Sequence, residues 1–293
     1  MHTVILYATF SGSGKGVKVA NQLSKALKEA GIQFSIFENE WPADLTPYQC
    51  AIVTGGDGTI NYYFNKYQDK CLPVILLPGG TGNDFYWTLY GNRTISQQIT
   101  DVLLLLEDKK PMTYKAVDIV KCVIDQQKTK YFNNSLGLGF DGAVLQNMQA
   151  IRLIGGHLGY MLAVIKNIFT FKEIAYQLRH GNHSSEIKAT LLNVANSPRT
   201  GGGFMISPHA KINDGLVNVL HCSVPGIVAR LGVLTKVERG KHLGQKNLFY
   251  FPTEQISIST TAPVNGQIDG DLIEGKYFEI MMAEWKARIV IFN

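Results

Sequence analysis

The stretch that decides the fold is residues 50–59, which read CAIVTGGDGT. Its first five residues are uncharged, as in a buried β-strand, and they lead directly into a loop with three glycines around Asp57. The apolar run at 72–77 opens in the same way into PGGTGND at 78–84. Glycines let backbone N–H groups approach phosphate oxygens, and carboxylates hold the Mg²⁺ that accompanies phosphates. Either loop alone could be a plain turn, but the two together predict phosphoryl transfer.

Strand-like and helix-like segments alternate in the first part of the chain. The expected strands are 4–8, 32–37, 50–54 and 72–77, and the expected helices are 20–30, 60–67 and 95–106. Alternation with continuously apolar strands predicts a parallel sheet that helices cover on both faces. Ligands bind such sheets at the carboxyl ends of the strands. A third glycine-rich loop, SGSGKG at 11–16, lies at the same edge as the other two.

Strand-like runs dominate after residue 111. The expected strands are 114–124, 130–134, 187–194, 216–221, 255–261, 277–282 and 287–292, and a helical insertion rich in Leu, Ile and Met interrupts them at 144–171. The predicted fold is therefore an α/β nucleotide-binding domain with a parallel sheet at 1–112, followed by an antiparallel β-sandwich domain at 113–286.

The net charge of +5 favours an anionic partner, such as a nucleotide or an acidic membrane. No block of like charges appears, which argues against a nucleic-acid partner. Basic residues are most concentrated in the segment with Lys236, Arg239, Lys241, His242 and Lys246. This segment is either a solvated face or a contact with a membrane surface. Neither a signal peptide nor a run of roughly 18 apolar residues appears. We expect a cytoplasmic protein with a peripheral contact on the inner membrane face.

The motifs resemble, in their order along the chain, those of the bacterial diacylglycerol kinase family, soluble lipid kinases related to sphingosine kinases. GGDGT at 55–59 is similar to the family's nucleotide loop, and LPGGTGNDF at 77–85 to its second signature. NSLGLGFD at 134–141 and the segment 201–215 are similar to motifs of its second domain. The resemblance implies an ATP- and Mg²⁺-dependent kinase that converts a membrane lipid, diacylglycerol above all, to its phosphate. It also implies that the last strand, 287–293, returns to the first domain.

The resemblance implies roles for individual residues as well. Those expected to line the ATP phosphates are Ser11, Gly12, Lys15, Gly55, Gly56, Asp57, Gly58, Thr59, Asn61, Gly80, Thr81 and Asn83. Asp57 and Asp84 would join Asp118 in a carboxylate network around the catalytic Mg²⁺, with Asp57 in an exposed loop. Without the resemblance, Asp118 would be taken for a solvent-facing residue at a strand edge.

A second, structural Mg²⁺ is implied at the Asn213-Asp214-Gly215 turn. The carboxylate of Asp214 would bind it together with the backbone carbonyls of Lys211 and Leu216. A simple Asn-Asp-Gly hairpin turn explains the same residues without a metal.

The chain departs from the family pattern at its expected general base. The family has Glu in an Asp-Gly-Glu motif, whereas this chain has Asp269-Gly270-Asp271, with a carboxylate one methylene shorter. We expect Asp271 to take the proton from the acceptor hydroxyl, with Glu274 as a nearby substitute. The first loop also lacks the family's Asn-Pro, and Tyr62 replaces a Glu after Asn61.

Two other functions stay open from the sequence. A NAD kinase-like enzyme shares the GGDGT loop, and the altered base is compatible with a nucleotide-binding regulator that has no kinase activity. The segment 153–171 is either a lipid-facing element or an ordinary core helix. A homodimer is compatible with the sequence.

Overall fold

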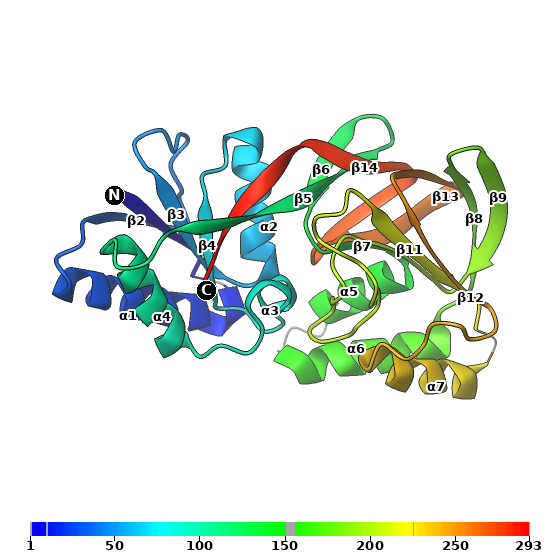
Figure 1. Cartoon of the computed structure of the whole chain (residues 1–293). Coiled ribbons are helices and arrows are strands. Elements are labelled where there is room, and N and C mark those ends of the chain that lie inside the picture. The colour runs from blue at the N-terminus through cyan, green and yellow to red at the C-terminus, as the bar shows by residue number, and fades with distance from the viewer. Residues whose placement is uncertain (1, 10, 151–155, 225, 293) are drawn as a thin grey trace. The chain divides into compact units, whose positions relative to one another are not determined.

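The computed structural model describes residues 2–9, 11–150, 156–224 and 226–292 (Figure 1). The chain divides into two compact units, Met1–Val117 with Trp285–Asn293, and Asp118–Glu284. The divisions fall inside strands β5 (Thr113–Ile124) and β14 (Asp271–Ile291), which contribute residues to both units. They lie a few residues from the expected boundaries at 112 and 287, because these two strands are continuous.

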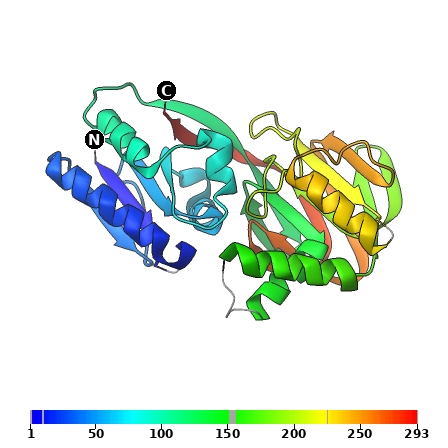
Figure 2. The same ribbon diagram turned by 90° about the horizontal axis from the view of Figure 1, so that it is seen from below.

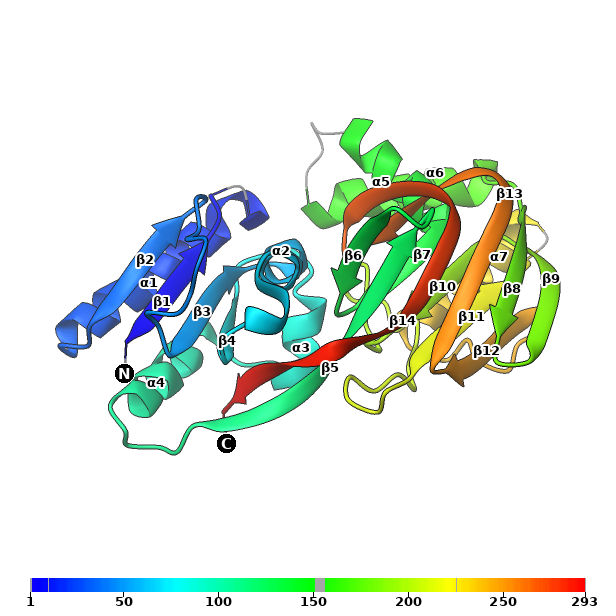
Figure 3. The ribbon, with the colours of Figure 1, turned by 90° about the horizontal axis from the view of Figure 1, so that it is seen from above.

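The first unit is built on a parallel sheet, which Figure 3 shows from above. Its strands are β1 (Thr3–Tyr7), β2 (Phe34–Glu38), β3 (Cys50–Gly55) and β4 (Val74–Pro78), in the order β4-β3-β1-β2. Every residue of β1 and β3 is buried, as in a parallel sheet that is covered on both faces. Ile289 of β14 pairs in parallel with Val74 of β4, so the end of the chain joins this sheet.

The helices of the first unit follow its strands. They are α1 (Lys15–Glu29), α2 (Asp57–Tyr67), α3 (Asp84–Tyr90) and α4 (Ile95–Leu106), with short 3₁₀ turns at Ser11–Gly14 and Gln68–Lys70. Leu23 and Leu27 of α1 and Val102 of α4 share one buried cluster with Ile5 and Ile52 of the sheet. Burying this apolar stripe of each helix against the strands is what holds the unit together.

The second unit is antiparallel, which confirms the predicted fold class. Its central strand order is β12-β11-β10-β7-β13-β14, where β7 is Ser135–Gly139, β10 is Leu191–Ala195, β11 is Val217–Cys222, β12 is Leu248–Thr253 and β13 is Gln255–Ile268. Strand β6 (Lys128–Phe132) pairs with β5, and the hairpin of β8 (Ile174–His180) and β9 (His183–Ala189) pairs with β13. Its core includes Phe132, Tyr176 and Phe278.

Three helices belong to this unit: α5 (Phe140–Ala150), α6 (Gly156–Thr170) and α7 (Ile227–Glu238). Figure 2 shows α6 and α7 next to each other, and Leu234 of α7 packs with Val164 and Ile168 of α6. The predicted insertion begins at Phe140 rather than at residue 144, and α7 was not predicted. Within the described residues, no helix is long and apolar enough to cross a membrane.

Two strand predictions were wrong. The single strand expected at 187–194 is the end of β9 and most of β10, because Thr190 leaves the β8–β9 hairpin and donates its N–H to Cys222 of β11. The two strands expected at 277–282 and 287–292 are both part of β14. The sequence predicted a break because the charged residues Glu284 and Lys286 interrupt the apolar pattern, although the strand continues through them.

Candidate functional site

The three glycine-rich loops meet at the carboxyl ends of β1, β3 and β4. Gly79 donates its N–H to the carbonyl of Gly55 at 2.7 Å. A Cβ on Gly56 would lie 2.8 Å from the Cα of Gly80, and one on Gly12 would overlap the carbonyl oxygen of Gly79. The glycines are therefore required by the packing of loop on loop, whatever ligand the loops bind.

Helices α1 and α2 begin at these loops without a side-chain cap. The residues before them are Gly14 and Gly56, which have no side chain to accept the first N–H groups. Helix α4, by contrast, begins with a capping box formed by Thr94 and Gln97. The positive end of a helix dipole favours an anion such as a phosphate group. Lys15, the first residue of α1, is exposed and adds positive charge at this edge.

Asp57 has a structural role that the sequence did not reveal. Its two carboxylate oxygens accept the backbone N–H groups of Asp84 at 3.1 Å and of Phe85 at 2.9 Å, the first residues of α3. Asp57 is half-buried and not in an exposed loop, which corrects the expectation. Asp84 is buried. The first acidic loop therefore holds the second in place.

Asn83 braces the second loop from within. Its Oδ1 accepts the N–H of Gly80 at 2.8 Å, and its Nδ2 donates to the carbonyl of Gly80 at 3.0 Å. Thr81 at the tip of this loop is exposed. Asn61, by contrast, is buried in α2 and accepts a hydrogen bond from Asn65. The side chain of Ser11 lies outside the described residues.

Asp118 and the Asn213-Asp214-Gly215 turn are linked in the second unit. The buried carboxylate of Asp118 accepts the N–H of Gly215 at 2.7 Å, and Asp214 accepts the N–H of Leu216 at 3.1 Å. Asp118 is therefore not a solvent-facing residue. Asp57 and Asp84 belong to the other unit, so the three-carboxylate network stays a prediction. Among the described residues there is no cluster of three or more His, Cys, Asp or Glu that could hold a metal.

The Asp269-Gly270-Asp271 motif forms the hairpin turn between β13 and β14. Asp269 and Gly270 have φ values of +47° and +91°, as a tight hairpin requires. The buried carboxylate of Asp269 accepts three backbone N–H groups, from Asn133 at 2.8 Å, Asn134 at 3.1 Å and Ser135 at 2.8 Å. Asp271 is exposed and forms an ion pair with Lys130 at 3.3 Å. Asp269 is therefore buried and fully hydrogen-bonded to the main chain, whereas the carboxylate of Asp271 is accessible to solvent.

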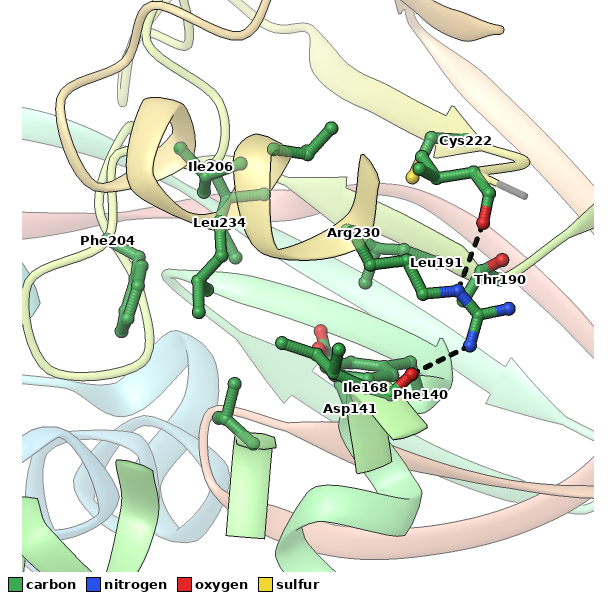
Figure 4. Close-up of a pocket in the computed structure, with 14 residues that line it drawn as sticks. Phe140, Asp141, Ile168, Thr190, Leu191, Phe204, Ile206, Cys222, Arg230 and Leu234 are labelled. Carbon is green, nitrogen blue, oxygen red and sulfur yellow. Dashed lines mark hydrogen bonds between the residues drawn. The ribbon is translucent and has the colours of Figure 1, made fainter. Parts of the chain in front are cut away.

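A pocket of about 90 Å³ opens in the second unit and is lined mainly by apolar side chains (Figure 4). Val164 and Ile168 come from α6, and Val233, Leu234 and Val237 come from α7. The lining residues from the strands and loops include Leu191, Phe204, Ile206, Cys222 and Val224.

Arg230 and Asp141 are the two charged side chains in this lining. Arg230 donates to the backbone carbonyls of Val224 at 3.0 Å, Ile168 at 3.0 Å and Phe171 at 2.9 Å. Carbonyl oxygens thus surround the positive charge of Arg230. Its hydrogen bonds to Ile168 and Phe171 connect α7 to the end of α6.

Asp141 gives the pocket a polar end. Burial raises the pKa of its carboxyl to about 6, and a hydrogen bond with Asn193 opposes this shift. The hydroxyl of Thr190, also in the lining, is buried and has no hydrogen-bond partner among the described residues. An apolar pocket with a carboxyl group and an unsatisfied hydroxyl at one end suits an amphiphilic molecule. Asp141 belongs to the motif NSLGLGFD, but no role was predicted for it from the sequence. Helix α7, which carries Arg230, was not predicted.

Family models match both units. Residues 2–119 match the diacylglycerol kinase catalytic domain, and residues 134–277 match the YegS C-terminal NAD kinase beta sandwich-like domain. The chain therefore belongs to the diacylglycerol kinase family, as the order of its motifs predicted.

Individual proteins agree with this assignment. Two relatives from Staphylococcus aureus, strains Newman and Mu3, bear the name "Putative lipid kinase", and each is 27% identical over 92% of this chain and 90% of its own length. Two crystal structures from Bacillus anthracis share the fold, one of a "putative diacylglycerol kinase" and one of a diacylglycerol kinase. The first has a TM-score of 0.74 at 22% identity and the second 0.70 at 20%, and each match covers 100% of this chain and 97% of the other.

Proposed function

We propose that this protein is an ATP- and Mg²⁺-dependent lipid kinase that phosphorylates a lipid hydroxyl, with diacylglycerol as acceptor and phosphatidic acid as product. The observation that carries the proposal is the meeting of three glycine-rich loops at one sheet edge, within a domain of the diacylglycerol kinase family. Phosphoryl transfer depends mainly on positioning and on neutralising charge, which such an edge supplies.

The loops fit a nucleotide triphosphate. The positive dipole ends of α1 and α2 favour phosphate oxygens, and a Cβ at Gly14 or Gly58 would meet nothing within 4 Å, so the loop surface is open there. Lys15 would neutralise phosphate charge. Asp57 and Asp84 are the carboxylates of this edge that would hold Mg²⁺, which would neutralise charge on the transferred group.

The pocket of the second unit fits the acceptor. Its apolar lining would take part of an acyl chain, and Asp141 and Thr190 would face the polar end of the lipid. Asp271, accessible on its hairpin and paired with Lys130, would take the proton from the acceptor hydroxyl. A kinase of membrane lipids also needs contact with a membrane surface.

Transfer of labelled phosphate from ATP to a panel of lipids tests the proposal. The panel contains diacylglycerol, monoacylglycerol and a sphingoid base, with NAD as a further acceptor, and each reaction is run with Mg²⁺ and with EDTA. Mg²⁺-dependent labelling of diacylglycerol is the expected result. Labelling of NAD alone would make the protein a NAD kinase-like enzyme. Binding of ATP without any transfer would favour the regulator.

A further inference from the structure

Helices α6 and α7 expose apolar side chains on their outer surfaces. On α6 the exposed fractions are 41% for Leu162, 39% for Ile165 and 54% for Phe169, and on α7 they are 40% for Ile227 and 37% for Leu231. The spacings of three and four residues place the members of each set on one side of their helix. We call these five residues the α6–α7 face.

The opposite side of α6 lines the pocket, whereas on α7 the pocket-lining residues continue the apolar stripe that includes Ile227 and Leu231. Val164 and Ile168 of α6 and Leu234 and Val237 of α7 are directed into it. A helix that covers a globular core normally has one apolar side and one polar side. Both sides of α6 carry large apolar residues, and the apolar stripe of α7 extends beyond the pocket to the exposed Ile227 and Leu231, so the packing of the second unit explains only the inner residues.

The charges around the α6–α7 face are mainly basic. Lys166 and Lys172 are exposed on and after α6. Residues 226–246, which contain α7 and the loop after it, hold five Lys or Arg and one Glu. Lys236, Arg239, Lys241 and Lys246 in this stretch are exposed, whereas His242 is buried and belongs to no basic surface, contrary to the sequence expectation.

We propose that the α6–α7 face docks the protein on an anionic lipid bilayer, with the five apolar side chains in the interface and the lysines against the headgroups. Exposed apolar residues bordered by basic ones are the features of a helix that lies in the membrane surface. The purpose of this docking rests on the proposed function, since the same two helices line the pocket for the acceptor lipid. The binding itself does not depend on kinase activity.

Sedimentation with vesicles tests the proposal. The probes are vesicles of pure phosphatidylcholine and of phosphatidylcholine with phosphatidylglycerol, in low and high salt. Wild type should bind the anionic vesicles, and more weakly in high salt. The double variant Ile165→Gln/Phe169→Gln should bind at least tenfold more weakly. The matched control Phe249→Gln, which alters an equally exposed ring on β12, should bind like wild type.

A second variant tests insertion directly. Phe169→Trp is a conservative change that should give a blue-shifted emission with anionic vesicles and quenching by brominated lipid, relative to wild type with its own three tryptophans. Absence of wild-type binding, equal binding by the double variant, or a Phe169→Trp emission that vesicles leave unchanged would each overturn the proposal. A wild-type dimer that the double variant turns into a monomer would instead assign this face to a second copy of the chain.

Kinase assays separate this proposal from the proposed function. With a short-chain diacylglycerol below its aggregation concentration, the double variant should retain wild-type turnover, because no bilayer is involved. With diacylglycerol in anionic vesicles, its turnover should fall about as much as its binding. A wild type that binds vesicles through this face but phosphorylates no lipid would leave the docking surface standing and remove the kinase assignment.

Discussion

The carboxylate of Asp57 accepts the backbone N–H of Asp84 at 3.1 Å, so the two acidic residues of the first unit are joined through the main chain. The same carboxylate accepts the next N–H, from Phe85, and thus caps α3. A residue expected to line the ATP phosphates and to bind Mg²⁺ therefore also fixes the relative position of two loops. Changes at Asp57 will alter stability and chemistry together, and the experiments must separate them.

We predict that Asp57→Ala lowers the free energy of unfolding by about 0.5–2 kcal/mol, the usual cost of losing a helix cap. Asp57→Asn keeps one side-chain oxygen as acceptor and should lose less. Both variants should lose phosphotransfer, because neither has a carboxylate for Mg²⁺. Urea unfolding and the labelled-phosphate assay measure the two effects, with Asp69→Ala, at an exposed acidic residue, as control. A stable Asp57→Asn with wild-type turnover would leave Asp57 with a structural role alone.

Alanine substitutions at Gly58 and Gly80 test separately the effects of loop packing and of ligand binding. A Cβ at Gly80 would overlap the Cα of Gly56, so Gly80→Ala should destabilise the unit by about 1–3 kcal/mol. A Cβ at Gly58 would meet nothing within 4 Å, so Gly58→Ala should leave stability unchanged or slightly raised. If the phosphates lie against α2, Gly58→Ala should nevertheless weaken ATP binding. Calorimetry with ATP and Mg²⁺ measures this, and unchanged affinity would place the phosphates elsewhere.

How far the sequence could predict the molecule depends on the range of the interactions. The strands β1, β3 and β4 and their loops were predicted because continuous apolar runs and glycines are local signals. The partners of Asp57 are 27 and 28 residues away, and those of Asp269 are 134 to 136 residues away. No local pattern reports such contacts, so the structural roles of both aspartates were missed.

Helix α7 was missed for a different reason. Its stripe of Ile227, Leu231 and Leu234 has helical spacing but is short, and Arg230 and Gly232 interrupt the apolar sequence, with Gly232 lowering the helix propensity. The pocket was therefore also absent from the sequence analysis. Strand β7, SLGLG, was missed because its two glycines are atypical of a strand, although a Cβ at Gly137 would overlap the carboxylate of Asp141.

The buried histidine His242 predicts a loss of stability in acid. Burial lowers the pKa of His242 below its ordinary value of 6.5, against a smaller opposing effect of its hydrogen bond with Ile206. The unfolded chain therefore takes up this proton at a higher pH than the folded chain, and the free energy of unfolding falls as the pH drops below about 6.5. One such group contributes a slope of at most about 1.4 kcal/mol per pH unit.

Urea unfolding between pH 7.5 and 5 measures that slope. His242→Gln removes the titrating group and should give a flatter dependence than wild type, whatever its stability at pH 7.5. Equal slopes in wild type and His242→Gln would contradict the prediction.

Asp214 tests the second metal site. Its carboxylate accepts the N–H of Leu216, and the neighbouring Gly215 is bonded to Asp118, so Asp214→Ala should loosen this turn and lower the melting temperature. If the turn also binds Mg²⁺, wild type without nucleotide should melt at a higher temperature when Mg²⁺ is added, and Asp214→Ala should not respond. A wild type indifferent to Mg²⁺ would make the motif a simple hairpin turn.

The two aspartates of the β13–β14 turn give the sharpest contrast, because they differ by two positions and have opposite environments. Asp269→Asn replaces one of the oxygens that accept three backbone N–H groups with an amide donor, so we expect a loss of stability. Asp271→Asn removes an accessible proton acceptor and should leave melting temperature and ATP affinity near wild type. Its turnover should fall by roughly 10²–10⁴, the usual contribution of general base catalysis.

Asp271→Glu completes this test. It restores the side-chain length of the family motif, so activity on diacylglycerol should be retained or raised. Lys130→Met removes the ion pair at 3.3 Å but keeps the carboxylate, so its turnover should fall less than that of Asp271→Asn. Unchanged turnover in Asp271→Asn would instead assign the role of general base to Glu274 or to water. A wild type that is inactive on every lipid but gains activity in Asp271→Glu would instead support the regulator, with Asp271 as the change that silenced a kinase.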